Sequence, residues 1–298
     1  MGREPLIAAV PQGGARTALS LSPAVRGSGE MNRRWLVLTA CATIAAVVGF
    51  QQAEPLEELR KYGTLHRGVG HCVGADEYSF VPAGMAAQTL VDSLAVLARC
   101  PSVREVVVPK MSHLGATLSR VAKVEHVLSL SIRRADVSDD DLMALAGMKN
   151  LQHLDLSRNP RVTDDGVAAL SGLESLRVLD LTSTNVTGMG LKDRADMVSL
   201  YQLTLTDCPV TDESLAVIPH FPKLEELLIG GTKVTDAGLM SLVGWHSLRR
   251  VDRTLRTTKA GSKAFNDAFL CARRKAREEG EAMAREDIPP VFIDNWRD

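Results

Sequence analysis

The chain has 298 residues, 45% of them hydrophobic, which is enough apolar material for one large domain or two ordinary ones. Its 35 basic and 36 acidic side chains give a formal net charge of −1, which excludes a general attraction to nucleic acid. Aromatic residues make up only 4% of the chain, too few for a base-stacking platform. We therefore expect a globular protein with an aliphatic core and local charged patches.

The N-terminal region has the pattern of an export signal. Residues 35–50 are uncharged and follow two arginines, which gives the basic and apolar regions of a signal peptide. Met31 lies shortly before them, so residues 1–30 either are unstructured or precede the true start. A helix of this length spans about 24 Å, short of a hydrocarbon core of about 30 Å. We assign residues 31–53 to a signal peptide or a membrane anchor, which places the protein at the cell envelope or outside the cell.

Three other interpretations of this region stay open. The sequence Leu38-Thr39-Ala40-Cys41 resembles a lipobox, although only a short apolar stretch precedes it. If Met1 is the start, the acid-poor N-terminal stretch fits an organelle transit peptide. A buried core helix is the structural alternative to both.

A period of 24 residues runs through the middle of the chain, with a single step of 25. An aliphatic residue opens each of seven registers: Val103, Val127, Leu151, Leu176, Leu200, Leu224 and Leu248. Aliphatic residues recur three and five positions later, giving the spacing L-x-x-L-x-L. Because side chains alternate along a strand, the fourth and sixth residues are buried on one face. A later apolar stripe with spacings of three predicts a short helix, so each repeat is strand, turn and helix.

The segments LDLSRNPRVTDDGVAAL, LTLTDCPVTDESLAVI and LLIGGTKVTDAGLMSL resemble leucine-rich repeats of the T-D-x-G-L, or cysteine-containing, subfamily. The resemblance covers residues 86–258. The subfamily includes uncharacterised exported bacterial proteins and eukaryotic F-box adaptors. It implies an α/β solenoid with a curved parallel sheet on the concave side and short helices on the convex side. Thr163, Thr211 and Thr235 stand at helix N-caps, and the aspartates after them fall in the positive first turn.

The two ends of the array depart from the repeat pattern, as the ends of a solenoid must. Ser79, Pro82 and Gly84 do not fit a repeat strand, whereas a helix is expected from Ser262 to Arg285, followed by a loose tail. We assign the chain to an N-terminal cap, the repeats, and a C-terminal helical cap with its tail, at residues 54–102, 103–258 and 259–298.

Polar side chains at the third, fifth, seventh and eighth positions of the repeats are predicted to lie on the concave face. Those that form the candidate partner-binding surface are Arg133, Arg134, His153, Asp155, Arg158, Asp180, Gln202, Thr206 and Asp207. Strands lie about 4.8 Å apart, so the three arginines can converge on a carboxylate or phosphate. The alternative is a solvated face of opposite charges that stabilises little.

The sequence contains no catalytic or metal-binding constellation. His153 and Asp155 lack a nucleophile at a special turn, and His66, His71 and Cys72 lack a fourth ligand. We therefore expect no enzymatic activity, no metal and no cofactor. The expected partner is a protein or peptide rather than nucleic acid, with membrane association through residues 35–50 if the anchor is retained. The alternative function is an intracellular substrate-recognition adaptor for protein ubiquitination, although no F-box-like module precedes the repeats.

Overall fold

The computed structural model describes the following parts of the chain: residues 55–68, 74–83, 87–110, 114–170, 172–194, 196–252, 256–278 and 292–294. They contain one ten-stranded sheet whose strands lie side by side in chain order, from β1 to β10. Only β1 and β2 are antiparallel, and every later neighbour is parallel. The predicted signal or anchor, residues 31–53, lies outside the described residues.

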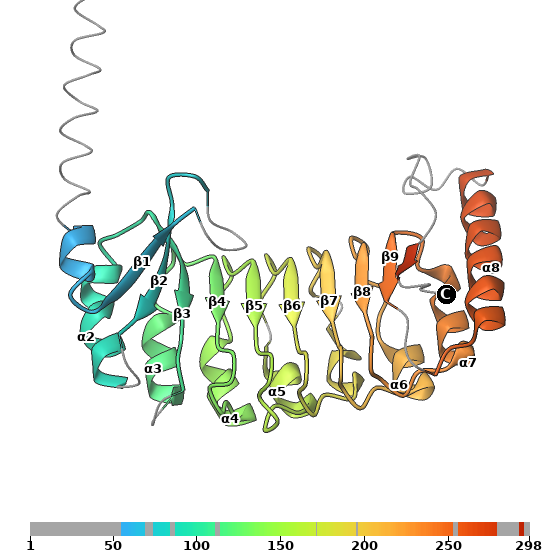
Figure 1. Ribbon diagram of the computed structural model, residues 1–298, viewed down its shortest axis with the longest axis horizontal. Coiled ribbons are helices and arrows are strands. Elements are labelled where there is room, and N and C mark those ends of the chain that lie inside the picture. The colour runs from blue at the N-terminus through green and yellow to red at the C-terminus, as the bar shows by residue number, and fades with distance from the viewer. Residues whose placement is uncertain are drawn as a thin grey trace, which may run out of the picture. The chain divides into compact units, whose positions relative to one another are not determined.

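Seven strands of this sheet come from the repeats, and they lie side by side along the solenoid (Figure 1). They are β3 (Val103–Val107), β4 (Ser129–Ser131), β5 (His153–Asp155), β6 (Val178–Asp180), β7 (Gln202–Thr204), β8 (Glu226–Leu228) and β9 (Arg250–Asp252). The fourth repeat positions pair from strand to strand, beginning with Val106, Leu130 and Leu154. Each of these three side chains is 0% exposed. The α/β solenoid predicted from the 24-residue period is therefore confirmed.

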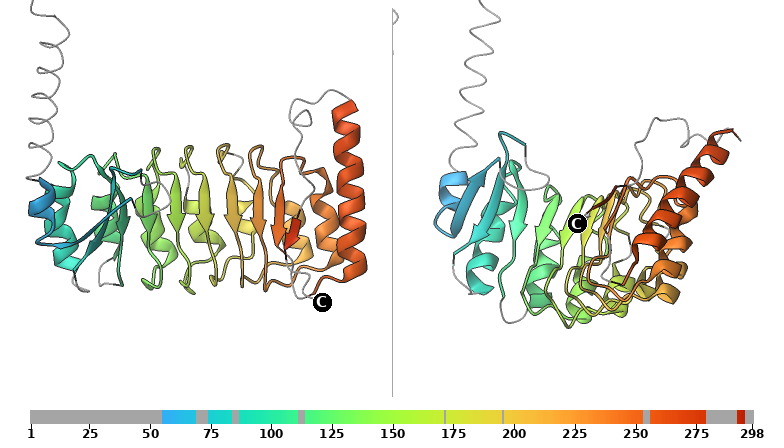
Figure 2. Two further views of the ribbon diagram at one scale, coloured as in Figure 1. Left: turned by 45° about the horizontal axis from the view of Figure 1, so that its top comes forward. Right: turned by 45° about the vertical axis from the view of Figure 1, so that its right-hand side comes forward.

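Short helical segments follow the strands and line one side of the sheet (Figures 1 and 2). They are α3 (Leu114–Val121), α4 (Asp139–Leu142), η1 (Met143–Leu145), α5 (Asp164–Ala169), η2 (Met189–Leu191), α6 (Asp212–Val217), α7 (Asp236–Met240) and η3 (Ser241–Gly244). Thr163, Thr211 and Thr235 are their N-caps, and each hydroxyl oxygen accepts from a backbone N–H of the first turn. The predicted caps are therefore confirmed.

The aspartates of the T-D motif also bind the following repeat. Asp164 accepts the hydroxyl of Thr187 at 2.6 Å and the N–H groups of Thr187, Gly188 and Gly190 at 2.9–3.2 Å. The same arrangement joins Asp139 to Thr163, Asp212 to Thr235, and Asp236 to Thr258. We call this set of contacts the aspartate ladder. It gives the aspartates an inter-repeat role in addition to the predicted interaction with the helix dipole.

Two repeats lack the ladder and have local substitutes. At the first, the Ser138 N–H and hydroxyl donate to Asp141 Oδ2 at 3.0 and 2.8 Å. The second is the repeat that contains Thr211. Gly188 stands where other repeats have aspartate, so Thr211 receives no carboxylate from the preceding repeat. Instead the Thr211 N–H donates to Ser214 Oγ at 2.9 Å, and the Ser214 N–H donates to Thr211 Oγ1 at 3.3 Å. In the repeats with a ladder, the Ser214 position is glycine, because a Cβ on Gly190 would overlap the Asp164 backbone. Ser214, which replaces the usual glycine, therefore compensates for Gly188, which replaces the usual aspartate.

The N-terminal segment corrects one expectation. It contains a helical stretch at residues 55–59, β1 (Gly63–Arg67), β2 (Tyr78–Pro82) and α2 (Ala87–Leu97). The prediction that the segment around Ser79 forms no repeat strand is wrong, because β2 pairs parallel to β3 and places Phe80 beside Val106. Phe80 is 0% exposed and takes the buried position that leucine holds in the repeats.

The C-terminal segment contains α8 (Lys259–Glu278) and β10 (Phe292–Asp294). Phe265 and Phe269 of α8 are both 0% exposed, and α8 lies beyond β9 at the end of the row of strands (Figure 2). The expected loose tail is wrong at β10, which pairs parallel to β9 with Ile293 beside Val251. Within the described ranges, no helix combines the length and apolar character needed to cross a membrane.

Candidate functional site

From β4 to β8, each strand ends in a turn at the same edge of the sheet, and the eighth repeat position there has a left-handed backbone. The φ angles at this position are 54° for Arg134, 62° for Arg158, 56° for Ser183, 58° for Asp207 and 71° for Gly231. The N–H groups of the first four donate to a carbonyl of the next repeat, as Arg134 does to Ser157 at 3.1 Å and Arg158 to Thr182 at 2.7 Å. These residues therefore follow one another along the edge, and we call them the edge row.

The three arginines of the predicted site lie in two adjacent turns of this edge. Arg133, Arg134 and Arg158 are all exposed, and their side chains form no ion pair or hydrogen bond with other residues in the described ranges. Lys110 precedes Arg134 by one period and extends the edge row, with its Nζ 3.3 Å from Asp136 Oδ2. Lys110 was not among the predicted site residues, although the 24-residue period places it there.

Asp155 and Asp180 support the turns that carry the arginines. Asp155 Oδ1 accepts the N–H of Ser157 at 2.9 Å, and Asp180 Oδ1 accepts the N–H and hydroxyl of Thr182 at 2.9 and 2.6 Å. Both side chains are half-buried. The two carboxylates therefore fix the backbone just before Arg158 and Ser183.

His153 is placed differently from the prediction that it is available to a partner. It is only 4% exposed, and its Nδ1 lies 3.2 Å from Ser129 Oγ, which in turn donates to Glu105 Oε1 at 3.1 Å. Ser129 is 0% exposed and Glu105 is 7% exposed. A substrate cannot reach a hydroxyl buried to this extent, so the Glu–Ser–His series is a structural row within the sheet.

Gln202, Thr206 and Asp207 lie two repeats beyond Arg158. Gln202 and Thr206 are half-buried, whereas Asp207 is exposed. The Asp207 carboxylate lies against the backbone of Gly231, where a Cβ would overlap it. The predicted residues thus divide into a basic part of the edge, an acidic part of the same edge, and a buried part within the sheet.

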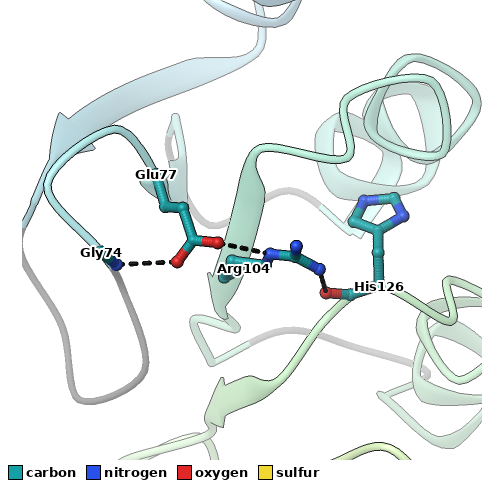
Figure 3. A network of polar contacts seen from close by, with 4 residues as sticks. All are labelled: Gly74, Glu77, Arg104 and His126. Carbon is teal, nitrogen blue, oxygen red and sulfur yellow. Dashed lines mark hydrogen bonds and ion pairs between the residues drawn. The ribbon is translucent and has the colours of Figure 1, made fainter.

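A second polar network, which sequence reasoning missed, attaches the β1–β2 region to the first repeat (Figure 3). Glu77 accepts the Gly74 N–H at 2.7 Å and Arg104 Nε at 2.8 Å, and Arg104 Nη1 donates to the His126 carbonyl at 3.3 Å. The Gly74 N–H and the Arg104 guanidinium lower the pKa of Glu77. Burial, followed by the Arg104 charge, lowers the pKa of His126. No local sequence pattern predicts these contacts, because they join a hairpin loop to another element.

The cysteines that the structure describes show no arrangement for metal binding or catalysis. Burial raises the pKa of Cys100 to about 11 and also raises the pKa of Cys208, whose Sγ donates to the Leu181 carbonyl at 3.0 Å. Cys271 is exposed on α8. Among the described residues, no group of three His, Cys, Asp or Glu side chains could hold a metal ion. Of the weak metal candidates, His71 and Cys72 lie outside these residues.

Comparison with solved structures found partial matches to other proteins. An internalin (InlF) of Listeria monocytogenes matches with a TM-score of 0.42 and 20% identity over 52% of this chain and 43% of its own. Internalin C2 of the same organism gives a TM-score of 0.42 and 23% identity over 58% of this chain and 71% of its own. A structure of the TLR13–ssRNA13 complex gives a TM-score of 0.42 and 17% identity over 57% of this chain and 27% of its own. This chain therefore spans less than half the length of the first of these proteins.

The family comparison is more specific. No curated protein matches the sequence significantly. The leucine-rich-repeat family model matches residues 125–186 and 149–210, which coincide with the repeats from β4 to β7. This segment therefore matches the leucine-rich-repeat family, and the strand register of the solenoid continues on both sides of it.

Proposed function

We propose that this chain is a non-enzymatic binding scaffold that holds a protein or peptide partner along the edge row and the adjoining concave face. The observation that carries the proposal is the group of three exposed arginines without ion-pair partners in the described part of the chain. Arg104, Arg249 and Arg250 each lie within 4 Å of a carboxylate, so these three arginines differ from others of the same sheet.

The turns give such a site a fixed geometry. Backbone hydrogen bonds to the next repeat and the Asp155 and Asp180 contacts hold the edge row before a partner arrives. A preorganised surface loses less conformational entropy on binding than a flexible loop does. The edge thus suits recognition, while Ser129 and His153 are buried within the sheet.

The proposed location is the cell envelope, by export or by membrane anchoring through residues 31–53. The support is the sequence pattern of two arginines followed by an uncharged apolar stretch. Cell fractionation of the full chain tests this directly. Recovery of the protein in the cytosol with residues 35–50 intact, as judged by mass spectrometry, would contradict the proposed location.

Site-specific photo-cross-linking tests the binding function. A photoreactive amino acid at Ser183, in the edge row, should capture a partner, whereas the same group at Met143 should not. Met143 is a suitable control because it is 64% exposed and follows a helix on the other side of the sheet. Equal capture from both positions, or none from Ser183, would contradict the proposal.

A further inference from the structure

We infer that the edge row recognises an extended peptide segment that has acidic side chains at one end and a basic side chain at the other. The inference rests on the proposed function and adds the chemistry of the partner. It follows from the order of charges along one edge: Lys110, Arg134, Arg158, Ser183, Asp207 and Gly231. The row changes from basic to neutral to acidic, so its charge has a direction.

The spacing of the row sets the spacing of the complementary charges. Arg158 and Asp207 are two repeats apart, and Arg134 and Asp207 are three repeats apart. At about 4.8 Å per strand, these separations are roughly 10 Å and 14 Å. An extended peptide advances about 3.4 Å per residue, so an acidic residue should precede or follow the basic one by about three or four residues.

Both ends of the row have capacity for such a partner. The guanidinium groups of Arg133, Arg134 and Arg158 have no carboxylate partner among the described side chains, so they can bind one in bidentate geometry. Asp207 is exposed, and its carboxylate accepts no hydrogen bond from the residues that the structure describes. Ser183 between them is half-buried and neutral, and suits the uncharged middle of the segment.

The same order of charges disfavours a nucleic-acid strand. A phosphate backbone carries one negative charge at every nucleotide, so it would meet Asp207 as well as Asp155 and Asp180 beside the arginines. The low aromatic content of the chain also offers little for base stacking. A peptide of mixed charge avoids this repulsion.

Selection of displayed peptides tests the inference. The full chain is immobilised and exposed to a library of random twelve-residue peptides, and enriched sequences are synthesised with a fluorescent label. We expect acidic residues with a lysine or arginine three or four residues away. Fluorescence anisotropy should show at least about a tenfold loss of affinity, or 1.4 kcal/mol, in the variant Arg134→Glu/Arg158→Glu.

The matched control is Arg161→Glu/Arg177→Glu, which makes the same change of charge at two other exposed arginines and should alter affinity less than about twofold. The direction of the row is tested separately with Asp207→Lys. This variant should bind the selected peptide more weakly than the wild type does. It should bind more tightly than the wild type to a peptide in which glutamate replaces the basic residue.

Several results would overturn the inference. Enriched sequences without acidic residues would do so, as would equal affinity for the two arginine variants. Tighter binding of a twenty-nucleotide poly-U RNA, lost in Arg134→Glu/Arg158→Glu, would indicate a polyanion partner instead. If cross-linking from Ser183 captures a partner but selection yields no acidic peptide, only the inference fails. If neither experiment detects binding, the proposed function fails with it.

Discussion

Removal of the Asp164 carboxylate should destabilise the solenoid far more than removal of its neighbour Asp165. Asp164 accepts four donors from the next repeat: the N–H and hydroxyl of Thr187 and the N–H groups of Gly188 and Gly190. A hydrogen bond to a charged group contributes about 1.5–3 kcal/mol. Because the site is half-buried, water will replace some of these bonds, and we expect Asp164→Ala to cost about 3 kcal/mol.

Asp165→Ala is the matched control, because Asp165 lies in the same first turn of α5 but is exposed. Both variants lose a favourable charge at the helix N-terminus, worth about 0.5 kcal/mol. Urea unfolding followed by circular dichroism measures the free energy of unfolding of both. For a domain of this size, 3 kcal/mol lowers Tm by roughly 6–12 °C. A difference below about 0.5 kcal/mol between the variants would refute the role of the aspartate ladder, since hydrogen bonds of this kind exceed it.

Three further predictions concern other parts of the solenoid. Gly190→Ala should cost about 2 kcal/mol or more in urea unfolding because its Cβ would overlap the Asp164 backbone, whereas Gly244→Ala, with no atom within 4 Å, should change stability little. His126 has a folded pKa below its ordinary value of 6.5, so its neutral form stabilises the fold above pH 6.5 and this contribution is lost as pH falls through 6.5 toward the folded pKa. The stability difference between wild type and His126→Gln should therefore shrink between pH 7.5 and 5.5, and a constant difference would contradict this explanation. In native protein at pH 8, iodoacetamide should label Cys271 while Cys100, with a pKa of about 11, stays unlabelled; mass spectrometry showing equal labelling would contradict the described burial.

The sequence alone predicts the strand register because the buried positions recur with a nearly constant period. The residues of the turn after each strand could also be predicted, because Arg134, Arg158 and Asp207 share one repeat position. Lys110 belongs to the same position, so the period also predicts its place in the edge row. The position of such residues can be predicted from the sequence because each repeat contacts only its neighbouring repeats.

The features that were missed depend on contacts between distant or irregular segments. In β2, Phe80 replaces the expected leucine and the register shifts between Tyr78 and Ser79, so the repeat pattern does not detect the strand. In β10, three residues return to pair with β9 after the helix, and nothing local indicates their partner. The burial of His153 depends on its packing within the folded sheet, which its repeat position alone does not specify.

The most direct test of the account is a double-mutant cycle between the edge row and a bound peptide. Arg158→Ala in the chain is combined with alanine at each acidic position of a peptide obtained by selection, and affinities are measured by isothermal titration calorimetry. We expect a coupling energy of about 1 kcal/mol between Arg158 and one acidic residue. Either single substitution already removes the interaction of a direct pair, so the double substitution costs less affinity than the sum of the two. We expect no coupling when Arg161→Ala is used in place of Arg158→Ala. Additive losses at every acidic position would contradict direct recognition by the edge row.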